Sequence, residues 1–412
     1  MRRDLFFIIP AIIVLIVFPA DAQWAQTQGL YGQAALITCM TSMDSVLFIG
    51  TLGAGIYRST NGQNWRAVNE GLPMQHIYAL YPHGTLLFAG GKQAHIYISA
   101  DSGETWVPAM YYFVSPYASE SITAFIVRSS LVSNPVFFAG SSSGRIYQSD
   151  DTGATWQLSA SGLEEVHCFV SMRRKFFLTS TIFAGTNRGV FRYEDGQWTQ
   201  KNNGLGDSSV YTMAALGDYV YAGTQSKIYR SADLGENWHG LAGPGSVGLA
   251  VWDANIFSCT SGNVSLSRDF GEHWEPAGWD PGRDGVCLRV ARGYLYAGTT
   301  HLGVWRRPLA EMLATVDADD ETGSVERFVL EQNYPNPFNP RTTITYHLLE
   351  RSQVLLRIFN LSGKEVATLV DGVEDRGTRS VVFDANGLAS GMYFYQLKCE
   401  SFLGMRQFLL LR

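Results

Sequence analysis

Residues Arg230–Trp238 have the sequence RSADLGENW, and the spacing of its serine, aspartate, glycine and tryptophan decides the fold. The same spacing, S-x-D-x-G-x-x-W, ends at Trp106, Trp156 and Trp274. Four occurrences in one chain of 412 residues indicate an internal repeat, which has to be identified before single elements are interpreted.

Each repeat unit contains four predicted strands. In the unit of Trp238, the apolar run Val210–Ala215 precedes Tyr219–Gly223, and a short turn leads to the alternating run Lys227–Arg230. The Asp/Gly turn then makes a hairpin into a strand that opens with Trp238. Seven units are marked by the glycine that ends the second strand, or by its replacement: Gly50, Gly90, Gly140, Gly185, Gly223, Cys259 and Gly298.

The seventh unit ends at Pro308 without a fourth strand, and a matching strand lies at the other end of the chain. Trp24–Leu30 (WAQTQGL) matches the fourth-strand segments that begin at Trp65 and Trp156. A ring of four-stranded sheets has to close, because its end sheets otherwise expose unpaired edges. The tryptophans recur 36 to 50 residues apart, around the blade period of ~40–45 residues. We therefore predict a seven-bladed β-propeller over residues 23–309, closed by the strand 24–28.

The repeated motif resembles the Asp box, or BNR repeat, of sialidases, sortilin-type receptors and photosystem assembly factors. Its residue types suit structural roles, because an aspartate accepts hydrogen bonds from its own turn and a tryptophan buries its ring between sheets. Bound calcium or catalysis is the alternative interpretation of these carboxylates. In the families it resembles, the box lies on the face opposite the usual ligand site. The structural box residues are Asp101, Asp151, Asp233, Asp269, Trp106, Trp156, Trp238 and Trp274.

The N-terminal segment has the pattern of a secretory signal peptide. Arg2 and Arg3 precede an apolar run at Leu5–Phe18, and Ala20 and Ala22 supply the small residues of a cleavage site. A membrane anchor is the alternative, although the run is shorter than the ~20 residues that a span needs. We expect cleavage near Ala22 and export of the mature chain.

The composition bounds the function classes. A net charge of −6 gives no nucleic-acid footprint, and the five cysteines form no C-x-x-C pair, so we expect no metal and no cofactor. Cys39 and Cys287 occupy equivalent places in the first and seventh units, and we expect them to remain free thiols because equivalent inner strands lie too far apart for a disulfide.

The C-terminal part of the chain differs in composition from the repeats. Residues 310–327 are acidic and predict a linker, and the strand-like runs after it are separated by turn signals, which favours an Ig-like β-sandwich at 328–412. This segment resembles the type A sorting domain of the type IX secretion system of Bacteroidota-like bacteria. The resemblance runs from Tyr334-Pro335-Asn336-Pro337-Phe338-Asn339-Pro340, through Ile358-Phe359-Asn360, to Leu410-Leu411-Arg412. It implies export across the outer membrane and contact with the secretion machinery. An ordinary Ig-like domain that binds the propeller's ligand is the alternative.

Ligand-binding candidates lie in the loops opposite the boxes. Rigid aromatic side chains among a few polar groups suit a sugar or a peptide, although solvated loops are the plainer interpretation. The candidates are Tyr111, Tyr112, Tyr117, Trp279, Arg283 and His301.

An enzymatic function has less support in the sequence. The Arg-Ile-Pro motif of sialidases is not present, and neither G-x-S-x-G nor H-E-x-x-H occurs. A glycosidase needs two carboxylates at a defined separation, and Asp280 and Asp284 lie only four residues apart on one loop. We therefore predict an all-β, secreted or surface-displayed monomer that binds a glycan or protein without catalysis. An extracellular glycoside hydrolase of sialidase or xyloglucanase type is the alternative.

Overall fold

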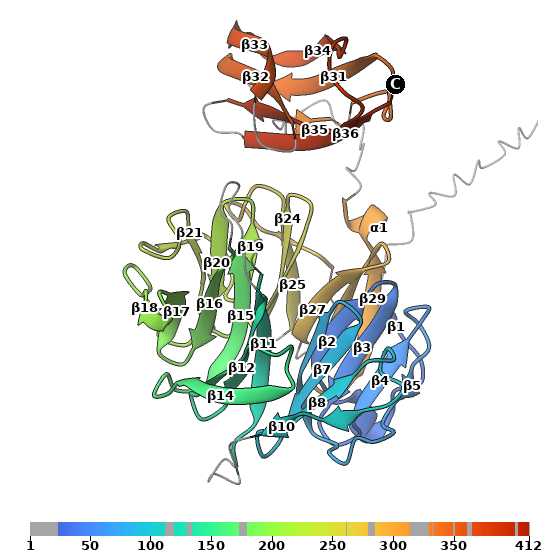
Figure 1. Cartoon of the computed structure of the whole chain (residues 1–412), viewed down its shortest axis with the longest axis vertical. Helices are drawn as coiled ribbons and strands as arrows, with labels where there is room; N and C mark the ends of the chain where they lie inside the picture. Colours follow the sequence, from blue (N-terminus) through green and yellow to red (C-terminus); the bar gives the residue numbers. More distant parts are fainter. Residues whose placement is uncertain are drawn as a thin grey trace, which may run out of the picture. The chain divides into compact units, whose positions relative to one another are not determined.

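The computed structural model describes residues 24–111, 119–129, 134–172, 179–260, 262–278, 285–313, 329–331, 333–348, 351–360, 365–399 and 403–411. The chain divides into two compact units, Met1–Thr315 and Val316–Arg412 (Figure 1). Both units are built from antiparallel sheets, so the predicted all-β fold class is confirmed.

Six sheets of the larger unit repeat one pattern, in which four strands follow one another in chain order. Their strands are β2–β5 (Ile37–Met43, Val46–Thr51, Ile56–Ser59, Arg66–Ala67), β6–β9 (Ile77–His83, Leu86–Gly91, Ile96–Ser99, Val107–Pro108), β11–β14 (Ile122–Arg128, Val136–Ser141, Ile146–Ser149, Thr155–Ala160), β15–β18 (Val166–Met172, Thr181–Thr186, Gly189–Glu194, Gln197–Gln200), β19–β22 (Thr212–Leu216, Tyr219–Gly223, Ile228–Ser231, His239–Gly240) and β23–β26 (Gly248–Trp252, Asn255–Thr260, Asn263–Ser267, Glu275–Pro276). The short strand β10 (Met110–Tyr111) adds to the β11–β14 sheet in parallel with β14.

A seventh sheet joins the two ends of the larger unit. It contains β27 (Gly285–Ala291), β28 (Tyr294–Thr299) and β29 (Val304–Pro308), and its outer strand is β1 (Ala25–Gln26). Ala25 pairs with Arg306 in an antiparallel register. The first strands β2, β6, β11, β15, β19, β23 and β27 contact one another in that order, and β27 contacts β2. The sheets therefore form a closed ring, a β-propeller.

The apolar core of the ring is divided among the seams between neighbouring sheets. Seven hydrophobic clusters of buried residues lie in the described part of this unit, and each draws its members from two adjacent sheets. At the seam between the first two sheets, for example, Phe48 and Leu87 are 0% exposed and Trp106 is 2% exposed. No sheet buries its apolar faces alone, so the ring depends on every seam.

The repeated tryptophan turn is held by its own side chains. Ser231 donates to Asp233 at 2.8 Å, and the Asp233 carboxylate accepts the backbone and side-chain N–H groups of Asn237 at 2.9 and 2.8 Å. Gly235 has a φ of +82°, and its N–H donates to the Ser231 hydroxyl. The turns at Asp101, Asp151 and Asp269 have the same bonds, with Thr105, Thr155 and His273 as donors.

The tryptophan turn also connects one sheet to the previous one. The backbone N–H of Trp106 donates to the carbonyl of Glu70 at 2.9 Å, and its indole N–H donates to the carbonyl of Val68 at 2.8 Å. A Cβ at Gly71, where φ is +77°, would lie 2.2 Å from the Trp106 carbonyl oxygen. Trp106, Trp156 and Trp238 are each 2% exposed, whereas Trp274 is half-buried.

Two features differ from a simple repeat. First, the chain continues from β29 into the helix α1 (Leu309–Leu313), where the sequence predicts an acidic linker from residue 310 onward. Leu309 and Met312 are buried against the last two sheets, so their apolar side chains explain the helix.

Second, the sixth sheet exchanges a glycine and a cysteine. Cys39 faces Gly50 in the first sheet, whereas Gly248 faces Cys259 in the sixth.

The smaller unit is a two-sheet sandwich. One sheet has the order β30 (Val329–Leu330), β31 (Arg341–Leu348) and β34 (Gly377–Asp384). The other has the order β33 (Glu365–Glu374), β32 (Ser352–Asn360), β35 (Gly391–Lys398) and β36 (Leu403–Leu410). The run Tyr334–Pro340 is an irregular arm in which Phe338 is 3% exposed within the sandwich core and Tyr334 is 82% exposed.

Candidate functional site

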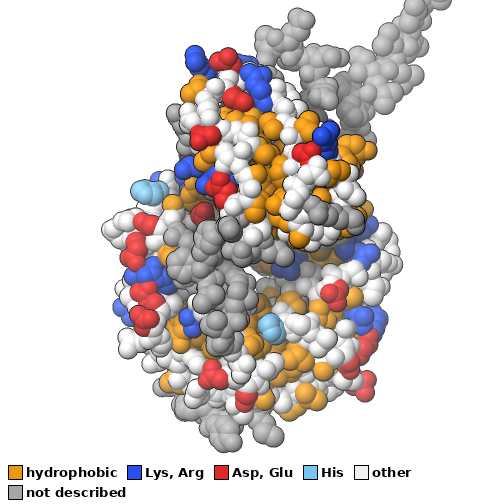
Figure 2. All heavy atoms as spheres, turned by 45° about the horizontal axis from the view of Figure 1, so that its top comes forward, with side chains coloured by type: hydrophobic (Ala, Val, Ile, Leu, Met, Phe, Trp, Pro, Cys, Tyr) orange, Lys and Arg blue, Asp and Glu red, His pale blue; other side chains and the backbone are white. Residues whose placement is uncertain are grey.

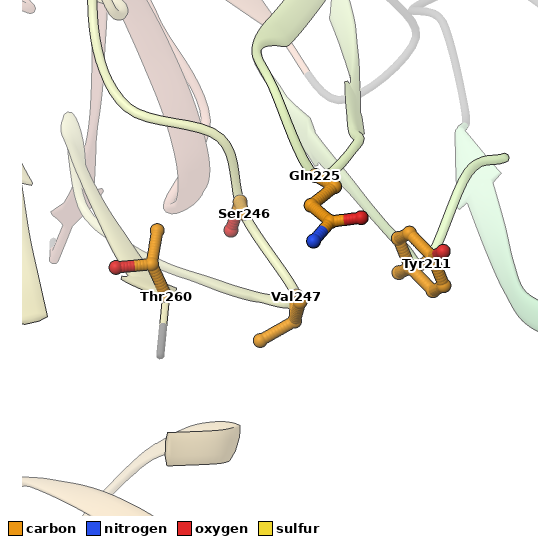
Figure 3. A pocket seen from close by; sticks show the side chains of 5 residues that line it. All are labelled: Tyr211, Gln225, Ser246, Val247 and Thr260. Carbon is orange, nitrogen blue, oxygen red and sulfur yellow. The ribbon is translucent and has the colours of Figure 1, made fainter. Parts of the chain in front are cut away.

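A pocket of about 370 Å³ lies between the fifth and sixth sheets of the ring (Figure 3). It is at the face where the first strands begin and where the turns between second and third strands lie, opposite the tryptophan turns. Its lining side chains are uncharged and come from four separate segments. They are Tyr211, Gln225, Ser246, Val247 and Thr260.

Tyr211 occupies a position that recurs in every sheet of the ring. It directly precedes β19, and its N–H donates to the carbonyl of Gly223 at 2.9 Å. In five sheets the equivalent residue lies at a register shift of the first strand, in the other two it directly precedes that strand, and all seven are half-buried. They are Thr38, Tyr78, Thr123, His167, Tyr211, Val247 and Val286. Because the backbone position is shared, the side chain at each one determines the local chemistry of this face.

His167 of the neighbouring fourth sheet packs against Tyr211. The two ring centroids lie 5.0 Å apart. His167 Nε2 lies 2.8 Å from the Asn187 side-chain oxygen, and His167 Nδ1 lies 4.0 Å from a carboxylate oxygen of Glu165. The Asn187 contact orients the imidazole ring of His167. The His167 ring therefore supports one side of the Tyr211 ring, which lines the pocket.

Asp207 holds the turn that carries Gln225. Its carboxylate accepts hydrogen bonds from Ser226 and, at 2.6 Å, from Thr224. These hydroxyl donors lower the pKa of Asp207 below its ordinary value. The carboxylate is therefore occupied in supporting the turn, and it does not line the pocket.

Ser246 connects the two sheets behind the pocket. Its backbone N–H donates to the Thr224 carbonyl at 2.7 Å, and its hydroxyl lies 3.0 Å from the Gly248 carbonyl oxygen. Ser246 is only 1% exposed, so its hydroxyl serves the backbone of the two sheets and does not face the pocket. The Gln225 amide, which both donates and accepts, lies beside the Tyr211 ring, whereas the Thr260 hydroxyl points away from the other labelled side chains (Figure 3).

The ligand candidates from the sequence are not gathered in this pocket. Tyr112, Tyr117, Trp279 and Arg283 lie outside the described residues. His301 lies exposed in the turn between β28 and β29, with its Nδ1 2.8 Å from the Thr300 hydroxyl. It is on the face that the sequence predicts, in the seventh sheet.

Tyr111 differs from its predicted place. Its backbone pairs in parallel with Trp156, so it lies beside a tryptophan turn rather than on the opposite face. The same crossing occurs at other seams, where Trp65, Trp106 and Trp238 bond to the carbonyls of residues in the preceding unit. The segment that links one sheet to the next therefore first passes the tryptophan turn of the next sheet, and only its later part reaches the pocket face.

Another charged group on this face has a structural role. Glu120 is 1% exposed and accepts hydrogen bonds from Ser143, Arg145 and Tyr147 at 2.6, 3.2 and 3.0 Å. Burial and the Glu120 charge raise the pKa of Tyr147 to about 12. Arg145 is thus tied to a buried carboxylate.

Within the described ranges, no three His, Cys, Asp or Glu side chains lie together as a metal site requires. None of the helices in those ranges is both long and apolar enough to cross a membrane.

Two family models match parts of the chain. Residues 332–409 match the secretion system C-terminal sorting domain, and residues 15–111 match the DUF6242 beta propeller domain. No curated protein matches the sequence. The chain therefore carries a sorting domain behind a β-propeller, which indicates export by the type IX secretion system to the cell surface or the medium.

Solved structures share the fold at low sequence identity. YCF48 bound to D1 peptide is 17% identical, with a TM-score of 0.54 over 71% of this chain and 99% of that one. YCF48 from Cyanidioschyzon merolae is 14% identical, with a TM-score of 0.50 over 69% and 99%. The extracellular domain of a putative one-component system from B. thetaiotaomicron is 12% identical, with a TM-score of 0.54 over 84% of this chain and 47% of that one. These likenesses support the propeller fold.

Proposed function

We propose that this chain is an exported seven-bladed Asp-box propeller that binds an extracellular glycan or protein without catalysis. The pocket between the fifth and sixth sheets carries the proposal. It offers an aromatic ring, an amide and a hydroxyl group, but its five lining side chains include no carboxylate, histidine, cysteine or lysine. A binding site of this composition orients a ligand, and its lining lacks the pair of carboxylates with which most glycoside hydrolases work.

The sorting domain supports an extracellular place of action. The proposed path begins with cleavage near Ala22 and ends with recognition of residues 328–412 by the secretion machinery. YCF48, whose solved complex holds a D1 peptide, supports protein as one of the two ligand classes. A glycoside hydrolase remains the competing function, with any carboxylate pair supplied from outside the pocket.

Truncation separates binding from export. We would express the full chain and a chain ending at Thr322 in a host with a type IX system, and measure both proteins in medium, surface and periplasmic fractions. The shorter chain keeps α1, whose Leu309 and Met312 complete the ring's packing. We expect it to fold and remain in the periplasm. Truncated protein in the medium at the level of the full chain would contradict the sorting role.

The non-catalytic role has its own test. Purified protein is incubated with an array of host and bacterial glycans, and released reducing sugar is measured alongside retained protein. Retention without hydrolysis supports the proposal, and turnover of any retained glycan would establish the hydrolase instead.

A further inference from the structure

We propose that the pocket at Tyr211 and Gln225 accommodates one uncharged sugar ring of an extracellular glycan. This inference rests on the proposed function and adds the class of ligand. The pocket volume of about 370 Å³ is near the lower end of the ~300–1,000 Å³ that small-molecule sites occupy. The space therefore suits a single ring with its substituents, while the rest of a glycan extends to solvent.

The polar groups of the pocket match the hydroxyl groups of a sugar. The exposed Gln225 side chain supplies both an acceptor oxygen and a donor nitrogen, and the half-buried Thr260 carries a hydroxyl. A sugar hydroxyl both donates and accepts, so each of its two functions finds a partner here. Figure 3 shows the Gln225 side chain directed toward Tyr211, with Thr260 on the other side of Val247.

Tyr211 and Val247 supply the apolar part of the site. An aromatic ring contributes a large contact area and few rotatable bonds, so little conformational entropy is lost on binding. His167 packs against Tyr211 at a centroid distance of 5.0 Å and is itself held by Asn187. Tyr211 is thus held in position before a ligand arrives, which lowers the cost of binding.

The uncharged lining favours neutral sugars over acidic sugars and phosphates. No lining residue is a lysine or arginine, and the nearby Asp207 carboxylate is held by Thr224 and Ser226. An anion placed against this lining meets no cationic side chain, so it gains no direct ion pair for the hydration that it gives up. A neutral sugar ring gives up hydrogen bonds between its hydroxyl groups and water, and hydrogen bonds to the pocket replace them.

The shape of the lining favours a sugar over a peptide. Extended peptides bind by adding a strand to an open sheet edge, and helical peptides bind in long apolar grooves. This lining comes instead from strand ends and turns of two sheets, with Val247 as its one aliphatic residue. A compact polar ligand can contact all of these short segments at once, which an extended strand or a helix cannot.

The test measures binding of the full chain to single sugars by isothermal titration calorimetry. The probes are glucose, galactose, mannose and N-acetylglucosamine, with N-acetylneuraminic acid and glucose 6-phosphate as acidic probes. The variants are Tyr211→Leu, Tyr211→Phe and Gln225→Ala. His301→Ala is the matched control, because His301 lies in the equivalent turn of the seventh sheet outside the pocket. Thermal unfolding of every variant verifies that the ring remains folded.

We expect at least one neutral sugar to bind, with Kd raised roughly tenfold by Tyr211→Leu and about fivefold by Gln225→Ala. Tyr211→Phe keeps the ring and should change Kd by about twofold or less, as should His301→Ala. Failure of every neutral sugar to bind, preference for an acidic probe, or equal affinity in folded Tyr211→Leu would overturn the inference. Retention of a longer glycan or a protein in that case would leave the proposed function intact.

Discussion

Arg230 in the fifth sheet of the ring forms an ion pair with Glu272 in the sixth, with 2.8 Å between Nη2 and Oε1. The pair bridges neighbouring tryptophan turns, since Arg230 is the last residue but one of the third strand and Glu272 lies two residues before the next tryptophan. Arg58 with Glu104, and Arg192 with Glu236, repeat the pairing at two other seams. Figure 2 shows acidic and basic side chains next to one another along the rim of the larger unit.

The seam between the second and third sheets uses apolar contact in the same position. There Ile98 replaces the arginine, Ala154 replaces the glutamate, and Ile98 lies against Gly153 of the next turn. At this seam both charges are replaced, although the two positions belong to different units, whereas at the seam of the seventh and first sheets Arg306 bonds to Gln63.

We predict a measurable but small coupling between Arg230 and Glu272. A double-mutant cycle with Arg230→Met and Glu272→Gln should give about 0.5 kcal/mol in the free energy of urea unfolding, because the Glu272 side chain is 55% exposed. The coupling should decrease in 1 M salt. Introducing Ile98→Arg with Ala154→Glu should produce a similar coupling at the apolar seam. A coupling that is zero or independent of salt would mean that the contact does not stabilise the seam.

Gly71 should be among the least replaceable residues of the ring. Gly71→Ala should destabilise the protein by at least ~2 kcal/mol more than Gly84→Ala, because an added Cβ at Gly71 meets the Trp106 carbonyl oxygen. Gly84 is the matched control, with a φ of +57° and open space around it, so both variants share only the backbone strain. Equal losses in denaturant unfolding would show that the Trp106 contact relaxes freely.

The tryptophan turns should make the propeller sensitive to acid. The Thr105 side chain and backbone N–H hold the pKa of Asp101 at about 2, and for Asp233 the Asn237 and Ser231 bonds outweigh burial and give about 2. Unfolded aspartate titrates near ~3.9, so the folded pKa is depressed. The stabilisation is then complete above about pH 5 and is lost as pH falls toward 2. Stability measured from pH 7 to pH 2 should decline less steeply in Asp233→Asn, and identical slopes would contradict this role.

The exchanged pair of the sixth sheet gives a compensation test. Gly248→Cys alone should cost roughly 1–3 kcal/mol, since its Cβ would lie 2.7 Å from the Cys259 sulfur and 3.3 Å from the Cys287 Cα. The double variant Gly248→Cys with Cys259→Gly restores the arrangement of Cys39 and Gly50, so it should recover most of that loss. Thermal unfolding measures all three proteins. A double variant no more stable than the single one would show that this position needs its own geometry.

The repeat made most of the fold predictable, because the serine, aspartate and glycine of each tryptophan turn form their bonds within five residues. The all-β class and the propeller follow from the periodic pattern. The helix α1 could not be predicted in the same way, since its five residues are stabilised by burial of Leu309 and Met312 against distant strands. The predicted face of Tyr111 is wrong for a related reason, since the sequence does not reveal that the segment between two sheets first pairs beside a tryptophan turn.

The pocket was beyond sequence reasoning because its residues come together only in the ring. Tyr211 lies in an ordinary apolar run, and Gln225 lies in a turn whose partner sheet begins after Ser246. One signal was present: the residue at the start of each first strand changes from unit to unit while its flanks are similar. His167, Tyr211 and Val247 are neighbours in this series, and they surround or line the pocket. Tyr112, Tyr117, Trp279 and Arg283 remain predictions.

The pairing of Ala25 with Arg306 also orders events in time. The ring cannot be completed until the ribosome has passed Arg306, because the two partners are nearly the whole propeller apart in sequence and closing so long a loop comes late in folding. The sorting domain is translated after that point. A secretion receptor that recognises only residues beyond the ring therefore selects chains in which every blade has already been made, and incomplete translation products carry no export address.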